Sequence, residues 1–404
     1  MTPLLQGPAN RATLLLLFSL LVFLRDPAPA RPDPGADIRG LLDVTFSTDG
    51  SALVLNRLNR GDSPLDAYRF RLFAEGKSGD HFEAFAQLMT NDAAAVYVYG
   101  AYAAYIPDPE RDLRILAGKL PWIIGGYSPR AYSNKNPLVG TPLLLQYHTT
   151  LKWTQLPADA ADLLKVWGTG QTPFAYSGDG GTRSIGMPVV YDNCWDVGAA
   201  LQGSAYPFEY AIGFVNGTPG HPSTVEDGLS GKCFLGRVGI APTNGVLVGV
   251  SASHGPYLTE GARNQVPFGH KLTDYNQDLV MVDATFEHGH LDVFGEAVHN
   301  TWQTPTVGNL KLNSFYLEGK YTFLGGLYAA ARVEGMYFSD LSAAGGQPQS
   351  WDADRTREEF GLGYRISREA LVKLVYQRNG RESLPSESPA HVADLIATQL
   401  SLKF

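Results

Sequence analysis

His288 and His290, separated by one glycine, are the two residues whose type and spacing come closest to a metal site. Two imidazoles can chelate a metal ion, but a stable site needs a third or fourth ligand, and the sequence places none beside them. The glycine-rich run 178–181 holds one aspartate and lacks the acidic spacing of a calcium loop. We therefore expect two exposed turn histidines and a flexible loop, with no metal and no cofactor.

Motifs of hydrolytic and nucleotide-dependent enzymes do not occur in the 404 residues. The sequence has neither a Gly-x-Ser-x-Gly elbow nor a Walker-type phosphate loop. Its formal net charge is −8 and its pI is about 5.6, which leaves no excess of cations for nucleic-acid phosphates. We expect neither an enzyme nor a nucleic-acid partner.

The composition is that of a folded, glycine-rich protein. Glycine contributes 44 residues, 44% of the chain is hydrophobic and only 18% is charged. Disordered chains combine low hydrophobicity with high net charge, so this class is excluded. A mean hydropathy of −0.12 excludes a polytopic helical membrane protein.

The first thirty residues have the features of a secretory signal peptide. Arg11 precedes an apolar run, 12–24, which is shorter than the about 20 residues of a membrane-spanning helix. Ala28 and Ala30 form the small-residue pattern of a cleavage site. We expect a signal peptide over 1–30, a proline-rich tether over 31–37, and an exported domain over 38–404.

This exported domain alternates apolar and polar residues with the period of a half-buried strand. In 354–366, for example, Phe360 and Leu362 lie on one face, while Arg357 and Glu359 lie on the other. About sixteen such segments occur, at 41–47, 66–76, 80–90, 95–106, 111–120, 192–203, 206–217, 232–241, 244–255, 275–287, 290–300, 311–324, 326–338, 354–366, 369–380 and 391–404.

Connection lengths alternate along the chain. Every second connection is a tight turn, and the others are mostly long: 48–65, 121–191, 218–231, 256–274, 301–310, 339–353 and 381–390, with 91–94 as a short exception. Outer-membrane barrels have short periplasmic turns and long extracellular loops. The sequence predicts an all-β fold, a transmembrane antiparallel β-barrel of about 16 strands. Extra strands at 143–145 or 149–153 would make 18.

Charged residues of both signs occupy the polar phase of these strands. Because the apolar face of a membrane barrel must face lipid, the polar phase must line the lumen. Mixed charges around a water-filled interior are typical of a pore. The expected lumen-lining residues are Arg69, Arg71, Arg114, Arg237, Glu318, Lys320, Arg332, Glu334, Arg357, Glu359, Arg365 and Lys373.

The last strand places Ile396, Leu400, Leu402 and the terminal Phe404 on one phase. Together with the strand count, this pattern resembles bacterial outer-membrane porins, over 38–404. The segment from Pro121 to Tyr147 is similar to the corresponding part of phosphate-selective-like porins. The resemblance implies that loop 121–191 folds into the lumen, that Phe404 is read by the barrel assembly machinery, and that the chain forms a homotrimer in outer-membrane lipid.

A passive diffusion channel for small hydrophilic solutes or ions is the function we expect. A plugged barrel acting as an adhesin or scaffold is an alternative, and so is an outer-membrane enzyme. Residues 121–150 contain Arg130 and Lys135 but no Asp or Glu. If this segment narrows the lumen, these two cations form the pore constriction and favour anions. Cation preference, or a position at the screened outer rim, is the alternative.

We also predict a disulfide between Cys194 and Cys233, the only cysteines of the chain. Export places them in an oxidising compartment, and the strands that follow both long loops begin at the same membrane face. Alkylation with and without reductant, followed by mass measurement, tests the pairing. Two thiols that label freely in the unreduced protein would refute it.

Overall fold

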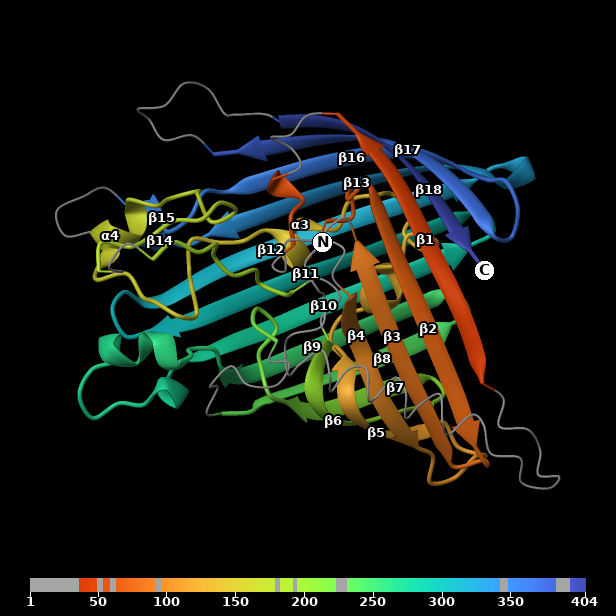
Figure 1. Ribbon diagram of the computed structural model, residues 1–404, viewed down its shortest axis with the longest axis horizontal. Coiled ribbons are helices and arrows are strands. Elements are labelled where there is room, and N and C mark those ends of the chain that lie inside the picture. Colours follow the sequence, from red (N-terminus) through yellow and green to blue (C-terminus); the bar gives the residue numbers. More distant parts are fainter. Residues whose placement is uncertain are drawn as a thin grey trace, which may run out of the picture. The chain divides into compact units, whose positions relative to one another are not determined.

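Sixteen antiparallel strands form a closed barrel in the computed structural model (Figure 1). The structure describes residues 36–48, 54–58, 63–91, 96–178, 182–191, 195–222, 231–341, 348–382 and 393–404, so the expected signal peptide lies outside the described residues. The barrel strands are β1 (Asp37–Ser47), β2 (Tyr68–Ser78), β3 (Phe82–Asn91), β4 (Val96–Tyr105), β5 (Leu113–Pro121), β6 (Trp195–Ala205), β7 (Phe208–Val215), β8 (Cys233–Thr243), β9 (Val246–Pro256), β10 (Asn276–His288), β11 (Leu291–Thr304), β12 (Gly308–Thr322), β13 (Leu327–Phe338), β16 (Arg355–Arg365), β17 (Ala370–Arg381) and β18 (Ala393–Lys403).

Each barrel strand pairs with its neighbours along the chain, and β1 pairs with β18 to close the sheet. Val44 lies opposite Leu400 at this seam, and the backbone of Gly40 exchanges hydrogen bonds with that of Phe404. Closure leaves no open sheet edge, which a lipid environment cannot hydrogen-bond. The 16-strand prediction is confirmed.

The 18-strand alternative is wrong. Residues 143–146 form the short helix α3 (Leu143–Gln146). Thr149 and Leu151 exchange backbone hydrogen bonds with Met187, a residue of the same loop, and not with a barrel strand. Strands β14 (Asp340–Leu341) and β15 (Gln349–Ser350) pair only with each other, outside the barrel.

The remaining helices are short and lie in the connections. None of the helices in the described residues is long and apolar enough to cross a membrane. They are α4 (Ala160–Leu164) and the 3₁₀ turns η1 (Ser128–Arg130), η2 (Glu260–Gln265), η3 (Leu272–Asp274) and η4 (Leu324–Gly326).

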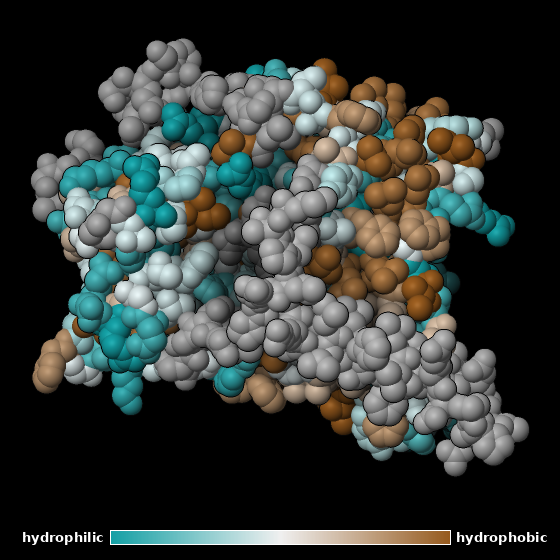
Figure 2. Space-filling view, in the orientation of Figure 1, coloured by the Kyte–Doolittle hydropathy of each residue, from teal (hydrophilic) through white to brown (hydrophobic). Residues whose placement is uncertain are grey.

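Side chains alternate across the barrel wall as the sequence predicts. On β16, Phe360 and Leu362 are about half exposed on the outer face, whereas Arg357 and Glu359 are buried on the inner face. Apolar residues gather toward the right of Figure 2, and the end with α4, β14 and β15 is mainly hydrophilic. This distribution is that of a barrel with lipid outside.

Short turns connect the strands at one end of the barrel, and mostly long loops connect them at the other. One predicted long loop is an exception. The expected long loop 301–310 is a tight turn, because β11 continues to Thr304 and β12 begins at Gly308. Trp302 pairs with Leu310 in this extension, and both side chains are buried inward. The residues beside Trp302 are polar and obscure the apolar–polar alternation, so the sequence predicts an end of this strand four residues before the observed one.

Candidate functional site

The connection between β5 and β6 contacts inward-facing side chains of the barrel wall, and its first part is the candidate site. We call residues 122–147 the lumenal segment. It passes Ser251 on β9 and Glu296 on β11, reaches Asp43 on β1 through Ser133, and returns along β17, β16 and β13. The segment therefore crosses the interior and is held by strands from most of the wall.

Carboxylates of the wall accept hydrogen bonds from backbone amides of this segment. Glu296 accepts from the N–H groups of Gly126 at 2.5 Å and Tyr127 at 3.1 Å. Glu359 accepts from Val139 at 3.2 Å and Gly140 at 2.9 Å. Glu334 on β13 likewise accepts from the N–H of Leu143. Such charge-assisted bonds are stronger than neutral ones and define the path of the backbone.

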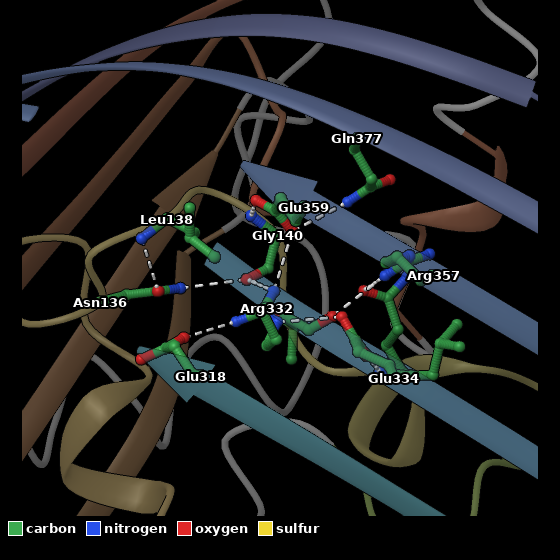
Figure 3. Close-up of polar contacts among 12 residues, drawn as sticks. Asn136, Leu138, Gly140, Glu318, Arg332, Glu334, Arg357, Glu359 and Gln377 are labelled. Carbon is green, nitrogen blue, oxygen red and sulfur yellow. Dashed lines mark hydrogen bonds and ion pairs between the residues drawn. The ribbon is translucent and has the colours of Figure 1, made fainter. Parts of the chain in front are cut away.

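Arg332 on β13 is the centre of the network that holds the segment (Figure 3). Its guanidinium lies 3.0 Å from Glu318, 2.9 Å from Glu334 and 2.9 Å from Glu359, and it donates to the carbonyl of Gly140 at 2.7 Å. The side chain is fully buried. All these donors and acceptors are satisfied within the barrel, so the guanidinium is not available as an open pore charge.

Lys373 on β17 holds the turn of the segment from the other side. Its ammonium donates to the carbonyls of Ser133 at 2.9 Å, Asn136 at 3.2 Å and Leu138 at 2.8 Å. Asn136 closes the same turn, because it donates to Gly140 O and accepts from Leu138 N. All three donors of the ammonium are therefore used, which is the condition for burying a lysine.

Two further contacts hold the second half of the lumenal segment. Arg357 donates to the carbonyl of Thr141 at 3.1 Å, and Tyr328 donates to the carbonyl of Pro137 at 2.9 Å. Tyr328 lies over Gly363 of the neighbouring strand, where a Cβ would overlap the phenol ring. Glycine at 363 thus provides the space for the tyrosine that reaches the segment.

The predicted lumen-lining residues fall into two groups. Eight are buried, and most of these contact the lumenal segment: Arg69, Arg71, Glu318, Arg332, Glu334, Arg357, Glu359 and Lys373. Those nearer the short-turn end stay accessible to water to different degrees: Arg114, Arg237, Lys320 and Arg365. In the second group Arg237 binds Asp283 and Glu209, and Lys320 lies 2.7 Å from Asp292. The sequence pattern gives the phase of these side chains along their strands but does not indicate which of them the lumenal segment covers.

The two predicted constriction cations differ in their surroundings. Arg130 forms an ion pair with Glu318, and its guanidinium lies 4.4 Å from the centre of the Phe294 ring. Lys135 is exposed, at the turn between Ser133 and Asn136. The charge of Arg130 is therefore compensated by a wall carboxylate, whereas that of Lys135 faces water.

The structure describes the terminal phenylalanine and one of the two cysteines. Cys233 is buried at the start of β8, and Cys194 lies outside the described residues, so the disulfide stays a prediction. Phe404 stacks on Phe70 with 6.1 Å between ring centres, at the β1–β18 seam. Its role as an assembly signal also stays a prediction.

A second anchor, which the sequence did not indicate, holds the loop beyond the segment. Asp352, between β15 and β16, accepts hydrogen bonds from the N–H groups of Thr150 at 2.8 Å and Gly168 at 3.0 Å. Arg355 donates to Tyr147 Oη at 3.1 Å and to Gly168 O at 2.8 Å. Burial raises the pKa of Asp352 to about 6. A single aspartate after a tryptophan has no sequence pattern that would mark it as a loop anchor.

Comparison with known proteins identifies the fold. No family model matches the sequence, and no curated protein matches it. Solved structures match it at low identity. Each of three covers 92% of this chain: OmpF of Salmonella typhi in complex with daunomycin (TM-score 0.53, 13% identity, 98% of that chain), the outer membrane channel DcaP of Acinetobacter baumannii (0.54, 10%, 98%) and the trimer form of OmpT, an outer membrane protein of Vibrio cholerae (0.51, 12%, 99%). The chain therefore has the fold of bacterial outer-membrane porins, and this fold indicates an outer-membrane protein.

Removal of the Lys373 ammonium should release the lumenal segment. We expect Lys373→Met to lower the free energy of unfolding by about 2 to 4 kcal/mol, because three segment carbonyls lose a charged donor. Protease cleavage within residues 128–141 should also become faster than in the wild type. Denaturant titration and timed proteolysis measure the two effects.

Lys403→Met is the matched control, since Lys403 is exposed at the end of β18. It should change neither quantity. If Lys373→Met were as stable and as protease-resistant as this control, Lys373 would not be an anchor of the segment.

Proposed function

We propose that this chain is a passive diffusion channel for small hydrophilic solutes or ions, narrowed by the lumenal segment. One observation carries the proposal: inward-facing charges near the short-turn end of β1, β2 and β5 stay accessible to water. The side chains of Arg39, Glu75 and Arg114 are 39%, 46% and 44% exposed. Mixed charges that face water inside a membrane barrel are the lining of an aqueous passage.

A plugged barrel is the second candidate, and a different observation favours it. Toward the long-loop end, apolar residues of the loop, such as Leu144, Leu151 and Leu163, pack with the wall residues Trp302 and Phe338 in one buried cluster. This packing restricts any passage to the space beside the loop. We therefore infer a narrow channel. The match to DcaP, an outer membrane channel, agrees with this function.

Planar-bilayer recording separates the two candidates and also tests the selectivity. A channel gives stepwise current, whereas a plugged barrel gives none. In a salt gradient the reversal potential should show anion preference, since Lys135 is exposed and residues 121–150 hold no acid. A unit charge about 8 Å from the ion path, screened by salt, corresponds to about a twofold change in the anion-to-cation permeability ratio. Lys135→Ala should lower the ratio by this factor.

Lys165→Ala is the control for this measurement. Lys165 is 66% exposed and follows helix α4 in the outer part of the loop, where salt screens it. A wild-type channel that prefers cations would contradict the selectivity proposal. So would a Lys165→Ala shift as large as that of Lys135→Ala.

We further propose that the barrel forms a homotrimer. The outer face of β3 and β4 carries Ala84, Ala86, Ala101 and Ala103, which pair across the two strands and let another barrel approach closely. One of the matched structures is a trimer form. Mass measurement in mild detergent should give three chains.

The same measurement on two variants tests this interface. Ala103→Trp should give monomers, because the indole holds the second barrel away. Val280→Trp, on the outer face of β10, should remain trimeric. A monomeric wild type would exclude the assembly.

A further inference from the structure

Five aromatic rings form a continuous row from the lumenal segment across the first strands of the barrel. The centre of the Tyr132 ring lies 5.5 Å from that of Phe73, and the Phe73 ring lies 6.5 Å from Phe85. Phe85 lies 5.1 Å from Tyr102 and 5.7 Å from Trp195. The last three rings are close to parallel, with interplanar angles of 24° or less. We call these five residues the aromatic row.

The row faces the lumen and is partly accessible. Phe73 lies opposite Gln87, whose side chain accepts a hydrogen bond from Tyr132 of the lumenal segment at 2.9 Å. Phe85 has the same phase as Gln87 and lies opposite Tyr102. Of the five rings only Trp195 is buried, and the other four are half-buried. A solute that passes beside the segment therefore meets ring surface and not only charged groups.

Ion pairs border the row on the side of the short turns. Glu75, opposite Phe85, binds Arg39, which itself lies opposite Phe73. Glu83 lies 2.8 Å from Lys77 and 3.6 Å from Arg114. Arg39 also lies 3.0 Å from Asp37, so three cations and three carboxylates form the border, and it offers both donors and acceptors without a single dominant sign. Exposed pairs of this kind are weak, and hydroxyl groups can exchange with them at low cost.

We propose that the aromatic row is a binding site for carbohydrate, taken as short chains of neutral pyranose sugars. A pyranose has an apolar face of C–H groups and a rim of hydroxyls. The C–H groups carry partial positive charge and stack on the negative faces of aromatic rings. The hydroxyls donate to carboxylates such as Glu75 and Glu83, and accept from Arg39 and Arg114. Apolar surface with a few oriented polar groups is the usual composition of a small-molecule site.

The balanced border is the reason to choose a neutral ligand over a charged one. An anionic or cationic aromatic solute would gain the ring contacts, but its charge would meet cations and carboxylates that already pair with each other within 4 Å. A polyol uses donors and acceptors alike. The row also ends at Tyr132, so a sugar chain bound along it would lie beside the segment that narrows the lumen.

Equilibrium binding tests the site without relying on conduction. The detergent-solubilised protein should bind maltohexaose in a calorimetric titration, and sorbitol, a polyol without a pyranose face, should bind far more weakly. Phe85→Leu should weaken maltohexaose binding about three- to tenfold, the free energy of one aromatic contact. Phe85→Tyr keeps the ring and should restore wild-type affinity.

Phe82→Leu is the matched control. Phe82 lies on the same strand but on the outer face, where it is 55% exposed. It should leave the affinity unchanged, and heat-dependent gel migration should show all variants folded. Equal loss in Phe82→Leu and Phe85→Leu, or equal binding of sorbitol, would overturn the site.

This inference rests on the proposed channel function only for the route by which the sugar arrives. In bilayers, maltohexaose should interrupt the ion current of the wild type and interrupt that of Phe85→Leu for shorter times. Ion current with no sugar binding by calorimetry would refute the aromatic row and leave the channel intact. Sugar binding without any ion current would refute the channel and leave the row.

Discussion

A charged side chain on a membrane-barrel strand can point only toward lipid or toward the interior. An arginine or lysine on the lipid face costs about 2 to 4 kcal/mol at the membrane centre, so the interior receives the charges. Inside, each charge needs a partner, because an unpaired buried ion is costlier still. Here the backbone of residues 122–147 provides many of the hydrogen-bond partners of these charges. Its amides meet Glu296, Glu334 and Glu359, and its carbonyls meet Arg332 and Lys373.

The same constraint explains what could be predicted from the sequence. A period of two fixes which side of the wall a residue faces, so the sequence predicts the strands and the inward phase of Arg332, Glu359 and Lys373. The sequence does not predict which groups these side chains bind. Backbone amides are identical at every position, so nothing in residues 139–140 marks them as ligands of a carboxylate 219 or more residues away. Arg130 looked like an open cation for the same reason, since its partner Glu318 is distant in sequence.

The interior is thus divided into two environments. Toward the long loops it resembles the core of a soluble protein, with a continuous apolar cluster and the buried anchors Asp352 and Arg355. Toward the short turns, ion pairs such as Lys320 with Asp292 are about one-third exposed. The aromatic row lies at the boundary, where rings contact both the loop and accessible charges. In the proposed channel, a solute would meet both apolar surface and water-facing polar groups at this boundary.

The anchors of residues 122–147 also join parts of the chain that are far apart in sequence. Lys373 lies on the second-last strand of the barrel, and its partner Ser133 is 240 residues earlier in the chain. The segment therefore makes its contacts to β16 and β17 only in a barrel that contains these late strands. Glu296, Glu318 and Glu334 of the middle strands hold other parts of the segment. The position of the segment and the closure of the wall thus depend on each other. A substitution in residues 122–147 would consequently weaken contacts to strands that are far apart in the sequence, and its effect would reach the stability of the whole barrel.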